Sequence, residues 1–161
     1  MEVNGDAEVT KFLPYATWRT RDDATAWLAR MQALGMSGTG QQLVIERASD
    51  RKVIGTVLLF KFDESSSRLE LGYVVGRCHW QQGFAREAIH AVCSHAFHHL
   101  SIRRIEAEVN PENAGSNRLL QALGFVREGL LRKRWVGKGE AYDTYIYGCL
   151  AEEWRGEPDA A

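Results

Sequence analysis

The sequence predicts an α+β fold in which helices flank a mixed, mostly antiparallel sheet. Three stretches rich in Val, Ile, Leu and Phe follow one another between residues 41 and 75, with only short polar breaks between them. Such a succession is typical of an antiparallel meander. The third stretch is followed by a helix and one further strand, so residues 68–109 have the order that is typical of a crossover connection. Together these patterns favour a single sheet with helices packed against it.

The bulk properties fit one ordinary domain. A chain of 161 residues can bury its own core, and we expect one domain over residues 1–161 with a flexible tail over 155–161. The 20 Lys and Arg residues nearly balance the 21 Asp and Glu residues, so the net charge of -1 argues against a nucleic-acid partner. The polar start and the lack of a long apolar run argue against a membrane partner. The 3 cysteines are widely spaced and form no CxxC pair. We therefore expect a cytoplasmic protein.

The first half of the chain predicts one helix and then strands. Residues 21–34 carry apolar side chains at helical spacing, and Gly35 provides a stop signal. Strands are expected over residues 41–47, 52–62 and 68–75, with polar turn residues between them.

The second half predicts helices that alternate with strands before the sheet closes. Asn113 is placed to cap the second of these helices, and Gly124 is placed to end it. The expected elements are a helix over 87–100, a strand over 102–109, a helix over 115–123, and strands over 125–135 and 142–150. The predicted core consists of Val44, Ile54, Val57, Leu59, Leu71, Val74, Ile89, Val92, Phe97, Ile105, Leu119, Leu123 and Phe125.

The segment from Tyr73 to Glu87 says most about function, because a strand passes through a short loop directly into the long helix. Gly83 and Ala85 are small residues at the first turn of that helix, so backbone amides can approach a ligand closely. The free N–H groups and the positive end of the helix dipole favour an anion such as a pyrophosphate. Neither GxxxxGK[ST] nor GxGxxG is present. A glycine needed only for steric reasons, or a phosphate cradle for a nucleotide, remains an alternative.

Two ordered motifs resemble the GNAT superfamily of N-acetyltransferases, in particular its RimJ/RimL-like branch of ribosomal-protein-alanine N-acetyltransferases. The first motif runs from Gly72 through Trp80 to Ile89, with Trp80 at the first position of the coenzyme A signature. The second motif is the run NPENAGSNRLLQALGF over residues 110–125. The resemblance extends from about residue 6 to residue 154 and implies a GNAT-like fold.

The resemblance also implies that acetyl-CoA is the cosubstrate, that no metal is needed, and that the acetyl group passes directly to a primary amine. The residues whose backbone amides would hold the pyrophosphate are Gln81, Gln82, Gly83, Phe84, Ala85 and Arg86. The strand at Tyr73, Val74 and Val75 would pair with the pantetheine arm, and Asn113 and Ser116 would lie near that arm. An amide of Val74 or Val75 would polarise the acetyl carbonyl.

Acetyl transfer to an amine also requires a base for the amine and a proton for the leaving thiolate. Glu108 matches, by motif position, a glutamate that similar enzymes use for protein N-terminal acetylation. Glu70 and Glu106 compete for this role, and each of the three could instead be a strand residue that faces solvent. Many GNAT enzymes place a tyrosine where this chain has Leu120. Ser116, one helical turn earlier on the same face, could protonate the thiolate or could help to satisfy the helix start.

Two departures from the family pattern leave the activity open. Leu120 replaces the tyrosine, and the usual first strand of the fold is missing, so a catalytically inactive acyl-CoA-binding module is the alternative function. A missing strand would expose a sheet edge, which favours a homodimer.

The acceptor is expected to be a protein N-terminus or a small-molecule amine. Trp135, Tyr142 and Tyr145 are candidates for its pocket, although aromatic residues in strands are often simply core. The histidines of the long helix have no partner at metal-ligand spacing.

Overall fold

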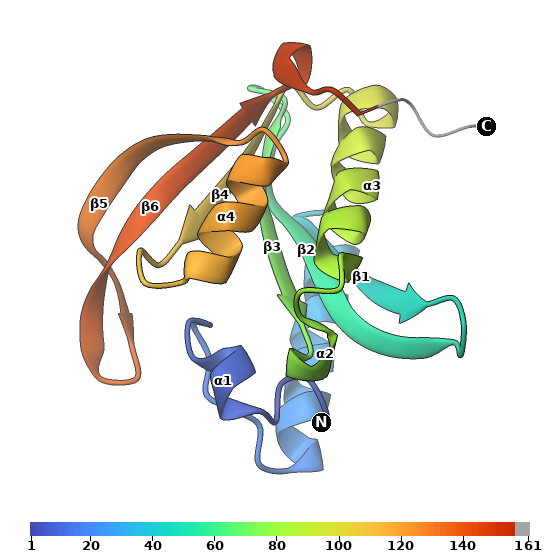
Figure 1. Ribbon diagram of the computed structural model, residues 1–161, viewed down its shortest axis with the longest axis vertical. Coiled ribbons are helices and arrows are strands. Elements are labelled where there is room, and N and C mark those ends of the chain that lie inside the picture. Colours follow the sequence, from blue (N-terminus) through green and yellow to red (C-terminus); the bar gives the residue numbers. More distant parts are fainter. Residues whose placement is uncertain (157–161) are drawn as a thin grey trace.

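The computed structural model describes residues 1–156 and contains a six-stranded mixed sheet with helices around it (Figure 1). The elements are α1 (Ala7–Thr10), α2 (Arg21–Met36), β1 (Gly40–Arg47), β2 (Lys52–Asp63), β3 (Arg68–Val75), α3 (Phe84–His99), β4 (Arg104–Val109), α4 (Ala114–Ala122), β5 (Val126–Gly137) and β6 (Glu140–Leu150). The predicted α+β class and its order of elements are confirmed. The short helix α1 was not predicted.

The sheet consists of two parts that meet at a short parallel contact. The strand order is β1-β2-β3-β4-β6-β5, and only β3 and β4 are parallel, because α3 connects them as a crossover. These two strands pair over residues 68–70 and 104–106 and then separate. Figure 1 shows them diverging toward the end of the sheet where α1 and α2 lie.

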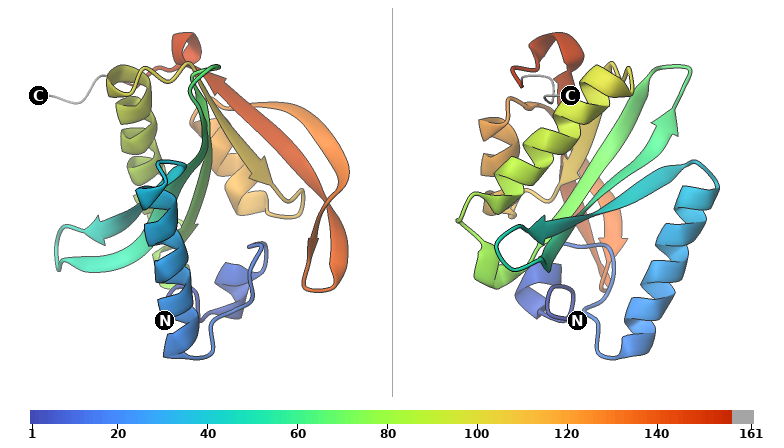
Figure 2. Two further views of the ribbon diagram at one scale, coloured as in Figure 1. Left: turned by 180° about the vertical axis from the view of Figure 1, so that it is seen from behind. Right: turned by 90° about the vertical axis from the view of Figure 1, so that its right-hand side faces the viewer.

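Local sequence explains where the main helices begin. The Thr20 hydroxyl accepts the backbone N–H of Asp23 at 3.4 Å, and the Asp23 carboxylate accepts the N–H of Thr20 at 2.9 Å, which starts α2 with a capping box. In α3, which runs across one face of the sheet (Figure 2), Ile89 and Cys93 are fully buried. They form the centre of the core together with Ile105 of β4 and other buried strand residues.

The predicted core is largely confirmed, but it is wrong at Val44, which is 62% exposed. β1 is an edge strand, and its pleat turns Ile45 toward the core and Val44 toward the opposite face. Val92 and Leu119 are half-buried at the margin of the core.

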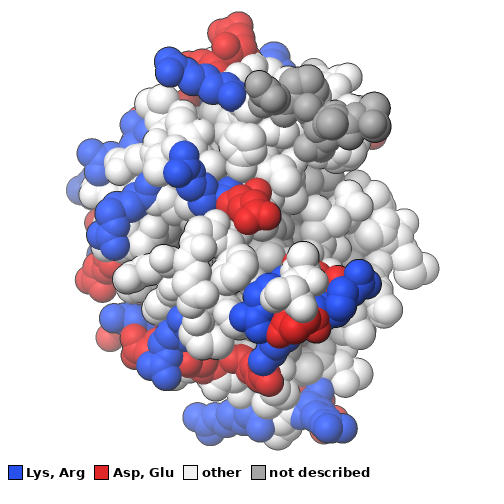
Figure 3. Space-filling model, turned by 45° about the vertical axis from the view of Figure 1, so that its right-hand side comes forward, with Lys and Arg blue, Asp and Glu red and all other residues white. Residues whose placement is uncertain are grey.

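Within residues 1–156 the first strand is β1, so the sheet lacks the first strand of the family pattern, as predicted. A homodimer across this edge stays a prediction. The tail expected over residues 155–161 lies outside the described residues from position 157 onward. No helix in the described part of the chain is long and apolar enough to cross a membrane. On the face shown in Figure 3, basic and acidic side chains are interspersed, in keeping with the net charge of -1.

Candidate active site

The separation of β3 from β4 leaves a slot in the middle of the sheet. On its β2 side β3 is paired up to Val75, but toward β4 its pairing stops at Glu70. The backbone groups of residues 71–75 that point away from β2 therefore have no strand partner within the described residues. Trp80 satisfies one of these backbone groups, because its indole N–H donates to the Val75 carbonyl at 2.7 Å. The remaining groups can pair with a narrow, extended ligand.

The loop that follows β3 presents an open helix N-terminus beside this slot. It passes through the left-handed region at Gln81, with φ 59°, and at Gly83, with φ 87°. Gly83 is the N-cap residue of α3, and no side chain caps this helix. A Cβ at Gly83 would meet no atom within 4 Å, so the space around this turn is open. The uncapped N–H groups of residues 84–86 thus fit the pyrophosphate site that the sequence predicted.

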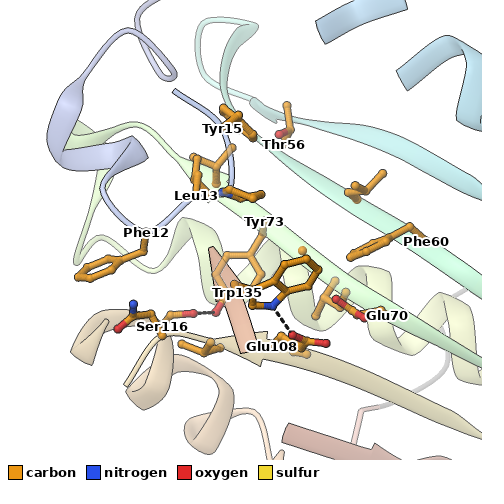
Figure 4. A pocket seen from close by; sticks show the side chains of 18 of the residues that line it. Phe12, Leu13, Tyr15, Thr56, Phe60, Glu70, Tyr73, Glu108, Ser116 and Trp135 are labelled. Atoms are coloured by element: carbon orange, nitrogen blue, oxygen red, sulfur yellow. Dashed lines mark hydrogen bonds between the residues drawn. The ribbon is translucent and has the colours of Figure 1, made fainter. Parts of the chain in front are cut away.

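A cavity of about 430 Å³ opens next to the slot, and this volume is typical of small-molecule sites. Its walls come from α2 and the segment before it, from β2, β3 and β4, from the start of α4 and from the β5–β6 hairpin (Figure 4). The segment before α2 contributes Phe12, Leu13 and Tyr15, a wall that the sequence did not reveal. Burial raises the pKa of Tyr15 to about 12, so this phenol stays protonated.

Two hydroxyl groups meet at one end of the cavity. The Tyr73 hydroxyl on β3 and the Ser116 hydroxyl on α4 are 2.5 Å apart (Figure 4). Asn113 caps α4 by accepting the backbone N–H of Ser116 at 3.2 Å, so the Ser116 hydroxyl is not needed to satisfy the helix start. Burial raises the pKa of Tyr73 well above its usual range, which keeps the phenol protonated. Sequence reasoning had selected Tyr73 only for its backbone.

Glu108 lies on another wall of the same cavity, and the β5–β6 hairpin holds it in place. Its Oε2 accepts the indole N–H of Trp135 at 2.5 Å, as drawn in Figure 4. Its Oε1 has longer contacts, at 3.4 Å from Arg134 Nη2 and 3.8 Å from Lys61 Nζ. The Glu108 side chain is 13% exposed, so it faces the cavity rather than bulk solvent.

Glu70 is the second carboxylate of the cavity. It is buried, and its Oε2 lies 2.5 Å from Lys61 Nζ. Burial raises the pKa of Glu70, while the hydrogen bond and charge of Lys61 act in the opposite direction without cancelling the effect. Lys61 was not selected from the sequence, because a single lysine in a predicted strand usually faces solvent.

Several residues weighed from the sequence lie apart from the cavity. Glu106 does not line it, and its carboxylate instead pairs with Arg104 Nε at 2.8 Å and Arg68 Nη1 at 3.0 Å. Leu120 is fully buried in the core. Of the aromatic candidates, Trp135 and Tyr142 line the cavity. Tyr145 does not, and its ring instead stacks under the Arg127 guanidinium, 4.5 Å from it. Among residues 1–156 no group of three His, Cys, Asp or Glu side chains could hold a metal ion.

The uncapped helix end, the slot in the sheet and the cavity with carboxylates and hydroxyls together suit a coenzyme A-dependent transferase. Residues 1–126 match the acetyltransferase (GNAT) domain, and the chain belongs to the GNAT family. It is an acetyl-CoA-dependent N-acetyltransferase, as the sequence predicted.

Relatives agree with this assignment. The uncharacterized N-acetyltransferase p20 of Bacillus licheniformis is 36% identical over 151 residues, which are 94% of this chain and 85% of that protein. RimJ of Mycobacterium smegmatis, solved with CoA-disulfide, has a TM-score of 0.82 at 24% identity and covers 91% of this chain and 72% of its own. The spermidine N-acetyltransferase of Vibrio cholerae, solved with CoA and spermine, has a TM-score of 0.80 at 21% identity. The match covers 93% of this chain and 86% of that protein's chain. The likeness to RimJ shows that the two chains share the fold.

Proposed function

We propose that the chain transfers the acetyl group of acetyl-CoA to a primary amine that enters the cavity, by direct attack of the amine. The observation that carries this proposal is that carboxylates and a hydroxyl pair line one cavity beside the slot between β3 and β4. The attacking amine must lose a proton, and the departing thiolate must gain one. The cavity offers a group for each step, so a covalent enzyme intermediate is not required.

The chain's own backbone would hold the cosubstrate. Acetyl-CoA supplies an activated acetyl group on a long, thin arm that ends in a pyrophosphate. The amides of residues 81–86 suit the pyrophosphate, because α3 has no side-chain cap and Gly83 leaves the turn open. The unpaired edge of β3 at Tyr73 and Val75 suits the arm, and the amide of Val75 would polarise the carbonyl, because the backbone of Val74 faces β2. Asn113 and Ser116 line the cavity near this edge.

Glu108 is the proposed base. Trp135 orients the carboxylate through Oε2, whereas Oε1 has no contact shorter than 3.4 Å among the described residues. That second oxygen is available to take a proton from the amine, directly or through a water molecule. Glu70 is the competing base, since burial raises its pKa toward the working range, but Lys61 already occupies its Oε2 at 2.5 Å.

Ser116 is the proposed general acid, and Tyr73 is proposed to donate a proton to Ser116. A serine hydroxyl alone is a weak acid, but the hydroxyl contact of 2.5 Å lets the protonated Tyr73 donate to Ser116 while Ser116 donates to the thiolate. This pair takes the role that a tyrosine at position 120 has in many GNAT enzymes. The acceptor is proposed to be a protein N-terminus or a small-molecule primary amine.

The test is thiol release from acetyl-CoA with a panel of acceptors, namely short peptides with varied N-termini, simple monoamines, polyamines and aminoglycosides. We expect turnover above the hydrolysis background with at least one class. Calorimetry with coenzyme A runs in parallel. Binding of coenzyme A without thiol release from any acceptor would contradict the proposal and would favour an inactive binding module.

A further inference from the structure

An irregularity in β2 brings an ammonium group into the acceptor cavity. β2 pairs regularly with β3 up to Phe60, which lies opposite Glu70, and the register then shifts before Asp63. Lys61 has φ 53°, in the left-handed region that residues with a side chain rarely adopt. In a regular strand the side chains of Phe60 and Lys61 would point to opposite faces, but here both line the cavity. The bulge therefore redirects Lys61 toward the site.

The ammonium of Lys61 lies among groups that would also bind a free ammonium ligand. Its Nζ is 2.5 Å from Glu70 Oε2 and 3.8 Å from Glu108 Oε1. It also lies 5.3 Å from the ring centroid of Phe60 and 5.7 Å from that of Trp135. Carboxylates and aromatic faces at such distances are the usual partners of a bound cation. We call Phe60, Glu70, Glu108 and Trp135 the ammonium cage. The side chain of Lys61 occupies this cage.

With Lys61 present, the charges of the cavity are balanced. Its carboxylates are Glu70 and Glu108; the Lys61 ammonium lies 2.5 Å from the first and 3.8 Å from the second. Arg30 is the other charged residue of the lining. Among the described lining residues, Glu108 serves the attacking amine and Glu70 is paired with Lys61, so no carboxylate is left for a second or third ammonium of a ligand. A polycation would have to displace Lys61 from Glu70, or its additional ammonium groups would lie in the cavity without a carboxylate partner. Either outcome is unfavourable.

We propose that Lys61 is a specificity-determining residue that excludes polycations and restricts the acceptor to molecules with one ammonium group. The inference rests on the proposed function, because it assumes that the amine acceptor occupies this cavity. The same fold serves a polycation in the spermidine N-acetyltransferase of Vibrio cholerae, so the fold alone does not set this preference. In this chain the bulge and the lysine that it redirects set it.

The test measures spermine binding by calorimetry for the natural chain and for Lys61→Met, with Lys61→Arg as the matched control. We expect the natural chain and Lys61→Arg to bind spermine equally weakly. Lys61→Met frees the carboxylates and should bind spermine at least about tenfold more tightly, which corresponds to about 1.4 kcal/mol. Lys61→Gln, which keeps a hydrogen-bond donor for Glu70, serves the same purpose if Lys61→Met does not fold.

A double variant separates charge from space. Lys61→Met with Glu70→Gln opens the same volume as Lys61→Met but restores the charge balance, so the gain in spermine binding should disappear. Tight spermine binding by the natural chain, or equal gains in the single and double variants, would overturn the proposal. Because the readout is binding, a failure of the acetyl-transfer proposal would be recognised separately, as absence of turnover with every acceptor.

Discussion

The indole N–H of Trp135 donates to Oε2 of Glu108 at 2.5 Å, which links the β5–β6 hairpin to the strand that carries the proposed base. The hydrogen bond leaves Oε1 as the oxygen that faces incoming groups. It also makes the hairpin a part of the active site and not only a wall of the cavity. The relationship predicts that a change in the hairpin alters the rate without altering cosubstrate binding.

Trp135→Phe should lower kcat for the best acceptor by roughly tenfold to a hundredfold. The variant keeps a ring at this position but removes the N–H donor, and a hydrogen bond to a charged group contributes about 1.5–3 kcal/mol. The KM for acetyl-CoA should not change, because Trp135 lies away from the α3 N-terminus. Steady-state kinetics with both substrates varied gives the two constants. An unchanged kcat would show that Glu108 does not need this orientation.

Tyr73→Phe and Ser116→Ala should each lower kcat, and the effects should not add. If the two hydroxyls pass on one proton, removal of Ser116 interrupts the transfer, and further loss of Tyr73 has little left to remove. General acid catalysis typically contributes about 10²–10⁴-fold, so Ser116→Ala should lose at least about a hundredfold. Rates of the single and double variants complete the cycle. Fully multiplicative losses would mean that the hydroxyls act independently.

Gly83→Ala should weaken coenzyme A binding more than its loss of stability explains. Gly83 has φ 87°, where any side chain is strained by about 1 kcal/mol, and its amide belongs to the proposed pyrophosphate site. Gly139→Ala is the matched control, because Gly139 has the same φ of 87° in the turn of the β5–β6 hairpin. Both variants should lose similar thermal stability, but only Gly83→Ala should raise the dissociation constant of coenzyme A. Equal dissociation constants of the two variants would show that the pyrophosphate does not bind at this turn.

Glu70→Gln should change how stability depends on pH. Burial raises the folded pKa of Glu70 above its ordinary value of 4.5, so the unfolded chain releases this proton more readily. The natural chain should therefore lose stability relative to Glu70→Gln as the pH rises from 4.5 through the raised pKa, and the difference should then level off. Urea unfolding of both proteins between pH 4 and pH 8 measures it. A relative gain in stability of the natural chain over this range would contradict the sign.

Regular patterns in the sequence predicted most of the fold, and the failures have local causes. Apolar periodicity correctly predicted the crossover helix α3 and the strand β4 that follows it, and Asn113 caps α4 as expected. Val44 was placed in the core because it is bulky, but an edge strand buries only one of its faces. The sequence also did not reveal the left-handed backbone at Lys61, because nothing in a run such as Phe60-Lys61-Phe62 distinguishes a bulge from regular alternation.

The proposed site was predictable to the extent that it follows the two motifs. Motif position selected Glu108, a place one helical turn before Leu120 selected Ser116, and Glu70 was weighed as a rival strand carboxylate. Contacts between distant segments were not predictable, since Tyr73 and Ser116 are 43 residues apart and Trp135 and Glu108 are 27 apart. Such pairs depend on how β3 and β4 separate and on how the hairpin folds back, which are properties of the whole sheet.

The most direct test of the central claim compares kcat of Glu108→Gln with kcat of Glu106→Gln, at saturating acetyl-CoA and with the best acceptor of the panel. Both changes remove one charge from the same strand, but only Glu108 lines the cavity. We expect a loss of about a hundredfold or more for Glu108→Gln and near-natural turnover for Glu106→Gln. Equal activity of the two variants would contradict the assignment of the base to Glu108.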